Sequence, residues 1–133
     1  MARVRNLLGA IAAAAALTGL VAPAATADEV HALDKQKCAD NVCLILFGSG
    51  YKVNKATVQG IGGVQGPAEY QFGYYAETGP TKTHEKICGG SGDGSNCVHQ
   101  FSIGATYAKG IRVCGWVKRM DNQQIIGNPC ITF

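Results

Sequence analysis

Short apolar runs alternate with breaks that contain glycine, proline or asparagine along the chain from residue 42 onward. The runs are rich in β-branched and aromatic residues, which fit the pleated surface of a sheet. After residue 27 no segment keeps the apolar period of an amphipathic helix. The pattern therefore predicts strands over residues 42–47, 51–59, 69–76, 82–88, 97–107, 111–120 and 124–132.

In one of these segments aromatic residues alternate with other residues. Tyr70, Phe72 and Tyr74 share one face of their strand, because successive side chains of a strand point to opposite faces. If exposed, this candidate aromatic face could stack on sugar rings or nucleobases. A sandwich core, however, requires one apolar stripe per strand, so we expect the three aromatic side chains in the core.

Seven short strands with frequent turn signals favour an all-β fold, a small disulfide-stapled β-sandwich that is immunoglobulin-like or barrel-like. Residues 28–37 are polar and show no clear period, so we expect a flexible N-terminal arm there. A short helix within residues 28–40 is the one exception expected to the strands. Residues 38–133 then form a single domain, since a chain of this length holds one core.

The first 27 residues have the layout of an export signal. Arg3 and Arg5 precede an uncharged apolar stretch over residues 7–21, and Ala25-Thr26-Ala27 supplies the small residues that a signal peptidase recognises. The stretch is shorter than the roughly 20 residues of a membrane anchor. We expect a Sec-type signal peptide, residues 1–27, cleaved after Ala27, and a secreted mature chain without a membrane span.

Loss of this signal changes the charge balance. Without Arg3 and Arg5, ten of the twelve basic residues remain, against nine acidic residues. A nearly neutral chain has no electrostatic reason to bind nucleic acid or an anionic membrane.

Six cysteines lie after the export signal. An even count in an exported chain indicates disulfides. Cysteines that bracket one turn or loop come together when the flanking strands pair. The pairs expected on this basis are Cys38–Cys43, Cys88–Cys97 and Cys114–Cys130.

One group of residues has the types needed for acid–base catalysis. His84, Glu85, His99 and Arg112 match small secreted ribonucleases, in which Glu is the base, His the acid and Arg stabilises the phosphorane. A Cys88–Cys97 link would bring His84 and His99 onto neighbouring strands of a hairpin. Alternation puts His84 and Glu85 on opposite faces, so surface positions are the simpler expectation.

The segment KRMDNQ, residues 118–123, is predicted to form a hairpin tip braced by the Cys114–Cys130 link. Many protease inhibitors present such a loop, because a pre-ordered loop loses less entropy on binding. Charged residues at a hairpin tip also serve solubility alone. The residues of this candidate binding loop are Lys118, Arg119, Met120 and Asn122.

No metal or cofactor site is expected. The segment GDGSN, residues 92–96, has one carboxylate, Asp93, and no glutamate to act as a bidentate calcium ligand. The cysteines lack the spacing of redox or zinc motifs. Hydrolase and nucleotide-binding motifs are absent from the sequence as well.

Two parts of the sequence resemble known secreted proteins. The segment GSGYKV, residues 48–53, together with the alanine-rich leader, is similar to the start of spore-associated-protein-type sequences of actinobacteria. The segments CGWV, residues 114–117, and NPC, residues 128–130, resemble the disulfide-bearing strands of secreted immunoglobulin-like chromophore-binding apoproteins. These resemblances imply a secreted bacterial β-sandwich and assign no functional residue.

The expected function is that of a secreted, non-enzymatic binding protein, which means an inhibitor, a toxin-like protein or a surface-associated module. Its partner would be an extracellular protein or a surface glycan. Two other hypotheses stay open. One is a small ribonuclease-like hydrolase that uses His84 and His99, and the other is a structural component of a spore or cell envelope.

Overall fold

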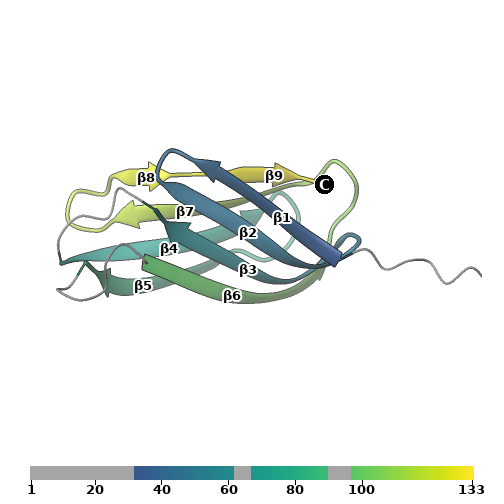
Figure 1. Cartoon of the computed structure of the whole chain (residues 1–133), viewed down its shortest axis with the longest axis horizontal. Helices are drawn as coiled ribbons and strands as arrows, with labels where there is room; N and C mark the ends of the chain where they lie inside the picture. Colours follow the sequence, from purple (N-terminus) through teal and green to yellow (C-terminus); the bar gives the residue numbers. More distant parts are fainter. Residues whose placement is uncertain (1–31, 62–66, 90–96) are drawn as a thin grey trace, which may run out of the picture.

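The computed structural model describes residues 32–61, 67–89 and 97–133, which form two antiparallel sheets and no helix (Figure 1). The predicted all-β, disulfide-stapled sandwich is confirmed. The strands are β1 (Ala32–Ala39), β2 (Val42–Ser49), β3 (Lys52–Gly60), β4 (Ala68–Ala76), β5 (Lys82–Cys88), β6 (Cys97–Thr106), β7 (Arg112–Arg119), β8 (Ile125–Gly127) and β9 (Cys130–Thr132).

The sheets are named here A and B. Sheet A has the order β1-β2-β3-β6, and sheet B has the order β5-β4-β7-β8, with β9 paired to the other end of β7. In Figure 1, β1, β2 and β3 lie in front of β4 and β7 and cross them obliquely. The edge strands β5 and β6 contact each other along one side of the sandwich, and β1 contacts β9 on the other.

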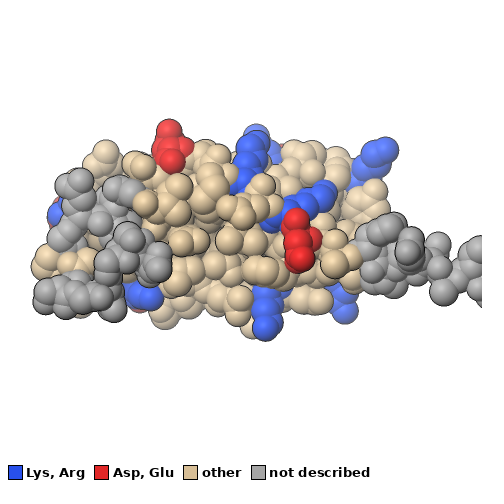
Figure 2. Space-filling view, in the orientation of Figure 1, with Lys and Arg blue, Asp and Glu red and all other residues tan. Residues whose placement is uncertain are grey.

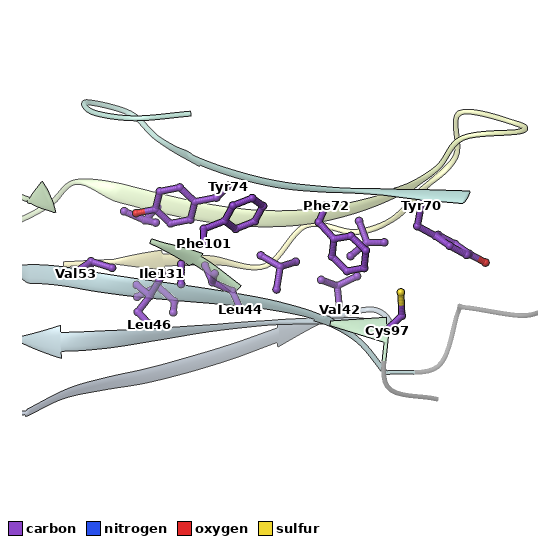
Figure 3. Close-up of a cluster of buried hydrophobic side chains, with 14 of the residues drawn as sticks. Val42, Leu44, Leu46, Val53, Tyr70, Phe72, Tyr74, Cys97, Phe101 and Ile131 are labelled. Carbon is purple, nitrogen blue, oxygen red and sulfur yellow. The ribbon is translucent and has the colours of Figure 1, made fainter. Parts of the chain in front are cut away.

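The core lies between the sheets. Tyr70, Phe72 and Tyr74 project from β4 toward the apolar residues of β2 (Figure 3), and all three are fully buried. Burial of an apolar side chain such as Phe72 contributes about 1.5–3 kcal/mol. The core expectation is confirmed, and the alternative of an exposed aromatic face is wrong, because the face that these residues share is the one turned toward sheet A.

The expected N-terminal arm and short helix are also wrong where the structure describes them. Residues 32–39 form β1, which pairs with β2 across a tight turn at Asp40 and Asn41. Asp40 has φ 52°, which suits the primed turns that match strand twist. The segment looks polar because β1 is an edge strand that turns Lys35 and Lys37 toward the gap between the sheets, on the same face as buried Leu33.

Most strand boundaries match the prediction within two residues, with one difference at the C-terminus. The predicted strand over residues 124–132 is divided into β8 and β9. Pro129 lies between them, and a proline has no backbone N–H to donate to a ladder.

The predicted signal peptide, residues 1–27, and the GDGSN segment, residues 92–96, lie outside the described residues. Within residues 32–61, 67–89 and 97–133, no helix is long and apolar enough to cross a membrane.

Candidate functional site

All three disulfides connect the cysteines that the sequence spacing predicts. Cys38–Cys43 joins β1 to β2 and Cys114–Cys130 joins β7 to β9, each between residues directly opposite in the register. Cys88–Cys97 instead ties β5 of sheet B to β6 of sheet A. The hairpin expected around this last pair is therefore wrong, because β5 pairs with β4 and β6 pairs with β3.

His84 and His99 nevertheless meet, at the side of the sandwich where β5 lies beside β6. Their rings stack with centroids 3.9 Å apart and planes 13° apart, and the His99 ring also meets the ring of Phe101 edge-on. Partial burial lowers the pKa of His99, and nearby His84 and Lys86 lower it further. The His99 ring therefore stays neutral to a lower pH than an isolated histidine.

Glu85 and Arg112 do not join this pair. The Glu85 carboxylate accepts a hydrogen bond from Gln71 at 2.7 Å on the outer face of sheet B. Arg112 pairs with Glu77 at 3.4 Å and lies five residues along β7 from the level of His84, or about 17 Å at the rise of a strand. The ribonuclease-like group thus loses its carboxylate and its arginine.

The candidate binding loop is only partly a loop. Lys118 and Arg119 lie within β7, paired with β4, and the turn begins after them. The prediction that both residues sit at the hairpin tip is wrong, because they are the last two residues of β7, which ends at Arg119. Arg119 forms an ion pair with Asp121 at 2.9 Å, and the side-chain oxygen of Asn122 accepts the Gln124 N–H at 3.0 Å.

The outer face of sheet B carries a groove of about 300 Å³ that the sequence did not reveal. Three strands that lie side by side, β4, β7 and β8, provide most of its walls. This volume is at the lower end of the range for small-ligand pockets. The residues that line the groove are Tyr75, Trp116, Lys118, Ile125 and Asn128.

Trp116 is the platform of the groove, and Gly73 determines its position. The two residues are opposite each other in the register of β4 and β7. A Cβ atom built on Gly73 would overlap the indole, so the ring lies directly over the bare backbone of β4. The ammonium group of Lys118 lies 5.8 Å from the centre of the same ring, within range of a cation–π contact.

The alternation of residues along the strands does indicate which side chains face outward at this site. Tyr75 and Trp116 directly neighbour the buried residues Tyr74 and Val117, so alternation directs them to the opposite, outer face. The register that places Gly73 opposite Trp116 is a long-range property, and sequence spacing alone does not supply it.

Two wider depressions have a different character. One, of about 480 Å³, lies around Phe47 on the outer face of sheet A, with Asp34 and Lys55 among its lining residues. In Figure 2, acidic and basic residues are scattered over the visible face without a large patch of one sign. The other depression, of about 570 Å³, lies where β1 meets β9 and is lined by Lys35 and Lys37. Neither has an aromatic ring held against bare backbone.

Comparison with family models, with curated proteins and with solved structures finds no match for this chain. Among the described residues, no three side chains of His, Cys, Asp and Glu gather in a way that could hold a metal ion. The candidate site therefore depends on the geometry of the Trp116 groove, whose lining residues combine an aromatic platform with one ammonium group and one amide.

Proposed function

We propose that the protein is a non-enzymatic binding protein that works outside the cell and recognises a surface glycan through the Trp116 groove. The observation that carries this proposal is the indole of Trp116 held over Gly73. A ring fixed in this way offers a flat apolar surface without an entropic cost of ordering it on binding.

The other lining residues suit a sugar. Tyr75 and Ile125 add apolar contact surface beside the indole. Lys118 and Asn128 supply polar groups, which can hydrogen bond to hydroxyl and carbonyl groups at the rim of a pyranose ring. An aromatic platform with a few polar groups around it matches the amphipathic character of a sugar, whose C–H face is apolar and whose edge is polar.

A substrate-like protease inhibitor has less support. Such an inhibitor presents a basic residue on an extended, accessible loop. Lys118 and Arg119 lie in a strand that is paired on both sides, and the ion pair with Asp121 occupies Arg119.

Trp116 is the only tryptophan in the sequence, so its fluorescence reports on the groove alone. The experiment is titration of the oxidised protein with soluble oligosaccharides of glucose, mannose and N-acetylglucosamine to about 10 mM, since a millimolar Kd corresponds to only about 4 kcal/mol. The expected result is a saturable change in emission with at least one series.

Calorimetry with the same oligosaccharide then tests two variants. Trp116→Ala should abolish binding, and Phe47→Ala, which removes an exposed aromatic ring on the opposite sheet, should retain it. The proposal is overturned if no series gives a saturable signal, or if Trp116→Ala binds as the unmodified protein does.

We also propose export, with cleavage after Ala27. Support comes from three disulfides, which persist in oxidising compartments. Cleavage there leaves β1 complete, because β1 begins at Ala32. The intact mass of protein from the culture medium should match a chain that starts at Asp28; a cell-retained chain with residues 1–27 attached would contradict this.

A hydrolase that uses His84 and His99 is a second candidate, favoured by the contact between the two rings. Its test is cleavage of RNA by the purified protein and by His99→Ala. Activity lost in the variant would support the hydrolase, and absence of cleavage by the unmodified protein would reject it.

A further inference from the structure

The described strands leave four sheet edges, and one of them carries in its own sequence none of the features that normally keep edges from pairing. An edge strand presents unpaired N–H and C=O groups that another strand can bind. Folded proteins discourage this with charged side chains that point inward, with prolines, or with very short strands.

The edges β1 and β5 both carry inward-pointing lysines. On β1, Lys35 and Lys37 lie opposite the buried residues Leu46 and Leu44. On β5, Lys82 and Lys86 lie opposite Tyr74 and Tyr70 in the same way. Residues directly opposite in an antiparallel pair share a face, so these four lysines point toward the interior side of their sheets.

The fourth edge, formed by β8 and β9, is protected by its length. Each strand has three residues, and Pro129 interrupts the edge between them. Little continuous backbone remains there for a partner strand.

The β6 edge differs from all three. Its ten residues, CVHQFSIGAT, include no lysine, arginine, aspartate, glutamate or proline, and among the described strands β6 pairs with β3 alone. A register shift opposite residues 53–55 and a positive φ of 66° at Gly104 mark a bulge near its end. Residues 97–103 remain as a regular run, and "the β6 edge" refers to this run.

The direction of the free backbone groups follows from one hydrogen bond. The Lys86 ammonium of β5 donates to the Val98 carbonyl at 3.1 Å, so this carbonyl points away from β3 and toward the side of the sandwich where β5 lies. In an antiparallel strand the N–H and C=O of every second residue point to the same side. Val98, Gln100 and Ser102 therefore direct their backbone groups outward.

We propose that the β6 edge binds the β6 edge of a second copy in antiparallel fashion and so extends sheet A across a two-fold axis. With the axis at Gln100, residue 98 of one copy lies opposite residue 102 of the other. Such a pairing is self-complementary, as a two-fold interface must be, and it brings no charged side chains of β6 together. The Val98 carbonyl has a second lone pair, so Lys86 can keep its hydrogen bond.

Paired strand edges bury less than the roughly 1,600 Å² of a standard stable interface, so the dimer should be weak and depend on concentration. The measurement is sedimentation equilibrium of the oxidised protein from about 5 to 500 µM, a range that brackets a weak interface. The dimer fraction should rise through this range, and a monomer at every concentration would overturn the proposal.

Two variants with the same substitution locate the interface. Gln100→Lys places two like charges opposite each other at the two-fold axis, which disfavours cross-strand pairing, and it should give a monomer throughout. Gln36→Lys adds the same charge at an exposed position on β1, the other edge of sheet A, and should dimerise like the unmodified protein.

The proposal is overturned if Gln100→Lys dimerises as strongly as the unmodified protein. Circular dichroism and thermal unfolding must first show that both variants are folded. Hydrogen exchange gives an independent test. The amides of Gln100 and Ser102 should gain protection as the protein concentration rises, and unchanged exchange in a dimeric sample would place the interface elsewhere.

Discussion

Gly73→Ala tests the contact on which the groove depends. In the interior of an ordinary strand, alanine is more favourable than glycine by about 0.5–1 kcal/mol, so this substitution would stabilise the protein if Trp116 lay elsewhere. In this structure the added Cβ would overlap the indole ring, so the ring has to leave the backbone of β4.

The magnitude follows from the surface that the ring loses. An enclosed tryptophan buries about 150–250 Å², and lifting one face from the sheet exposes about half of that. At about 25 cal/mol per Å² the loss is about 2–3 kcal/mol. Subtracting the gain from alanine leaves a net destabilisation of about 1–2.5 kcal/mol.

Urea denaturation followed by circular dichroism measures this change, and the tryptophan emission of the folded protein should move to longer wavelength as the ring enters water. The same substitution made in Trp116→Ala supplies the control. Without the indole, Gly73→Ala should be neutral or stabilising. Destabilisation of equal size in both backgrounds, or an unchanged emission spectrum in the single variant, would refute the proposed packing of Trp116 over Gly73.

Three further changes test the core, the β5–β6 side and the disulfides. Tyr74→Phe removes one partner of the buried hydrogen bond of 2.7 Å between the Tyr74 and Tyr107 hydroxyls. Urea denaturation should show that the free energy of unfolding falls by about 1–2 kcal/mol. Tyr107→Phe should then cost less in the Tyr74→Phe background than in the unmodified protein. Because the pKa of His99 is lowered in the folded state, the unfolded chain takes up the proton first as pH falls through the ordinary histidine range, so stability should decrease there. His99→Gln should flatten this part of the stability profile, and an identical profile would exclude His99 as its source. Replacing both cysteines of Cys114–Cys130, which are 16 residues apart, should cost about 3 kcal/mol, against about 2 kcal/mol for Cys38–Cys43, which are 5 apart; equal losses in urea would contradict the loop-length dependence.

The predictable part of this fold is the part encoded by alternation. The stripe formed by Tyr70, Phe72 and Tyr74 identifies its inner face without further information, because period two leaves these residues one common side. The edge strand β1 escaped prediction because its inward face begins with Leu33 and ends with the small Ala39, and the inward positions between them, 35 and 37, carry lysines. Inward lysines protect an edge, and the same lysines remove the apolar alternation by which strands are recognised.

The candidate site was less predictable than the core because it depends on pairing between distant segments. Tyr75 and Trp116 are 41 positions apart in the sequence and become neighbours only when β4 pairs with β7 in the observed register. His84 and His99 illustrate the same limit. Their proximity was expected from a hairpin, but it arises because two different sheets meet at β5 and β6.

The two proposed surfaces lie on different sheets, which has a consequence for binding. Pairing through the β6 edge extends sheet A and leaves the Trp116 groove on the outer face of sheet B uncovered. A dimer would therefore present two grooves.

On a surface with many copies of one glycan, a second binding event becomes intramolecular and can raise the apparent affinity by about 10²–10⁴-fold. Weak affinity of a single groove for a soluble oligosaccharide is thus compatible with tight retention on a polymer. Gln100→Lys separates the two effects: it should leave the affinity for a short oligosaccharide unchanged and weaken retention on the corresponding insoluble polysaccharide, while Trp116→Ala should abolish both.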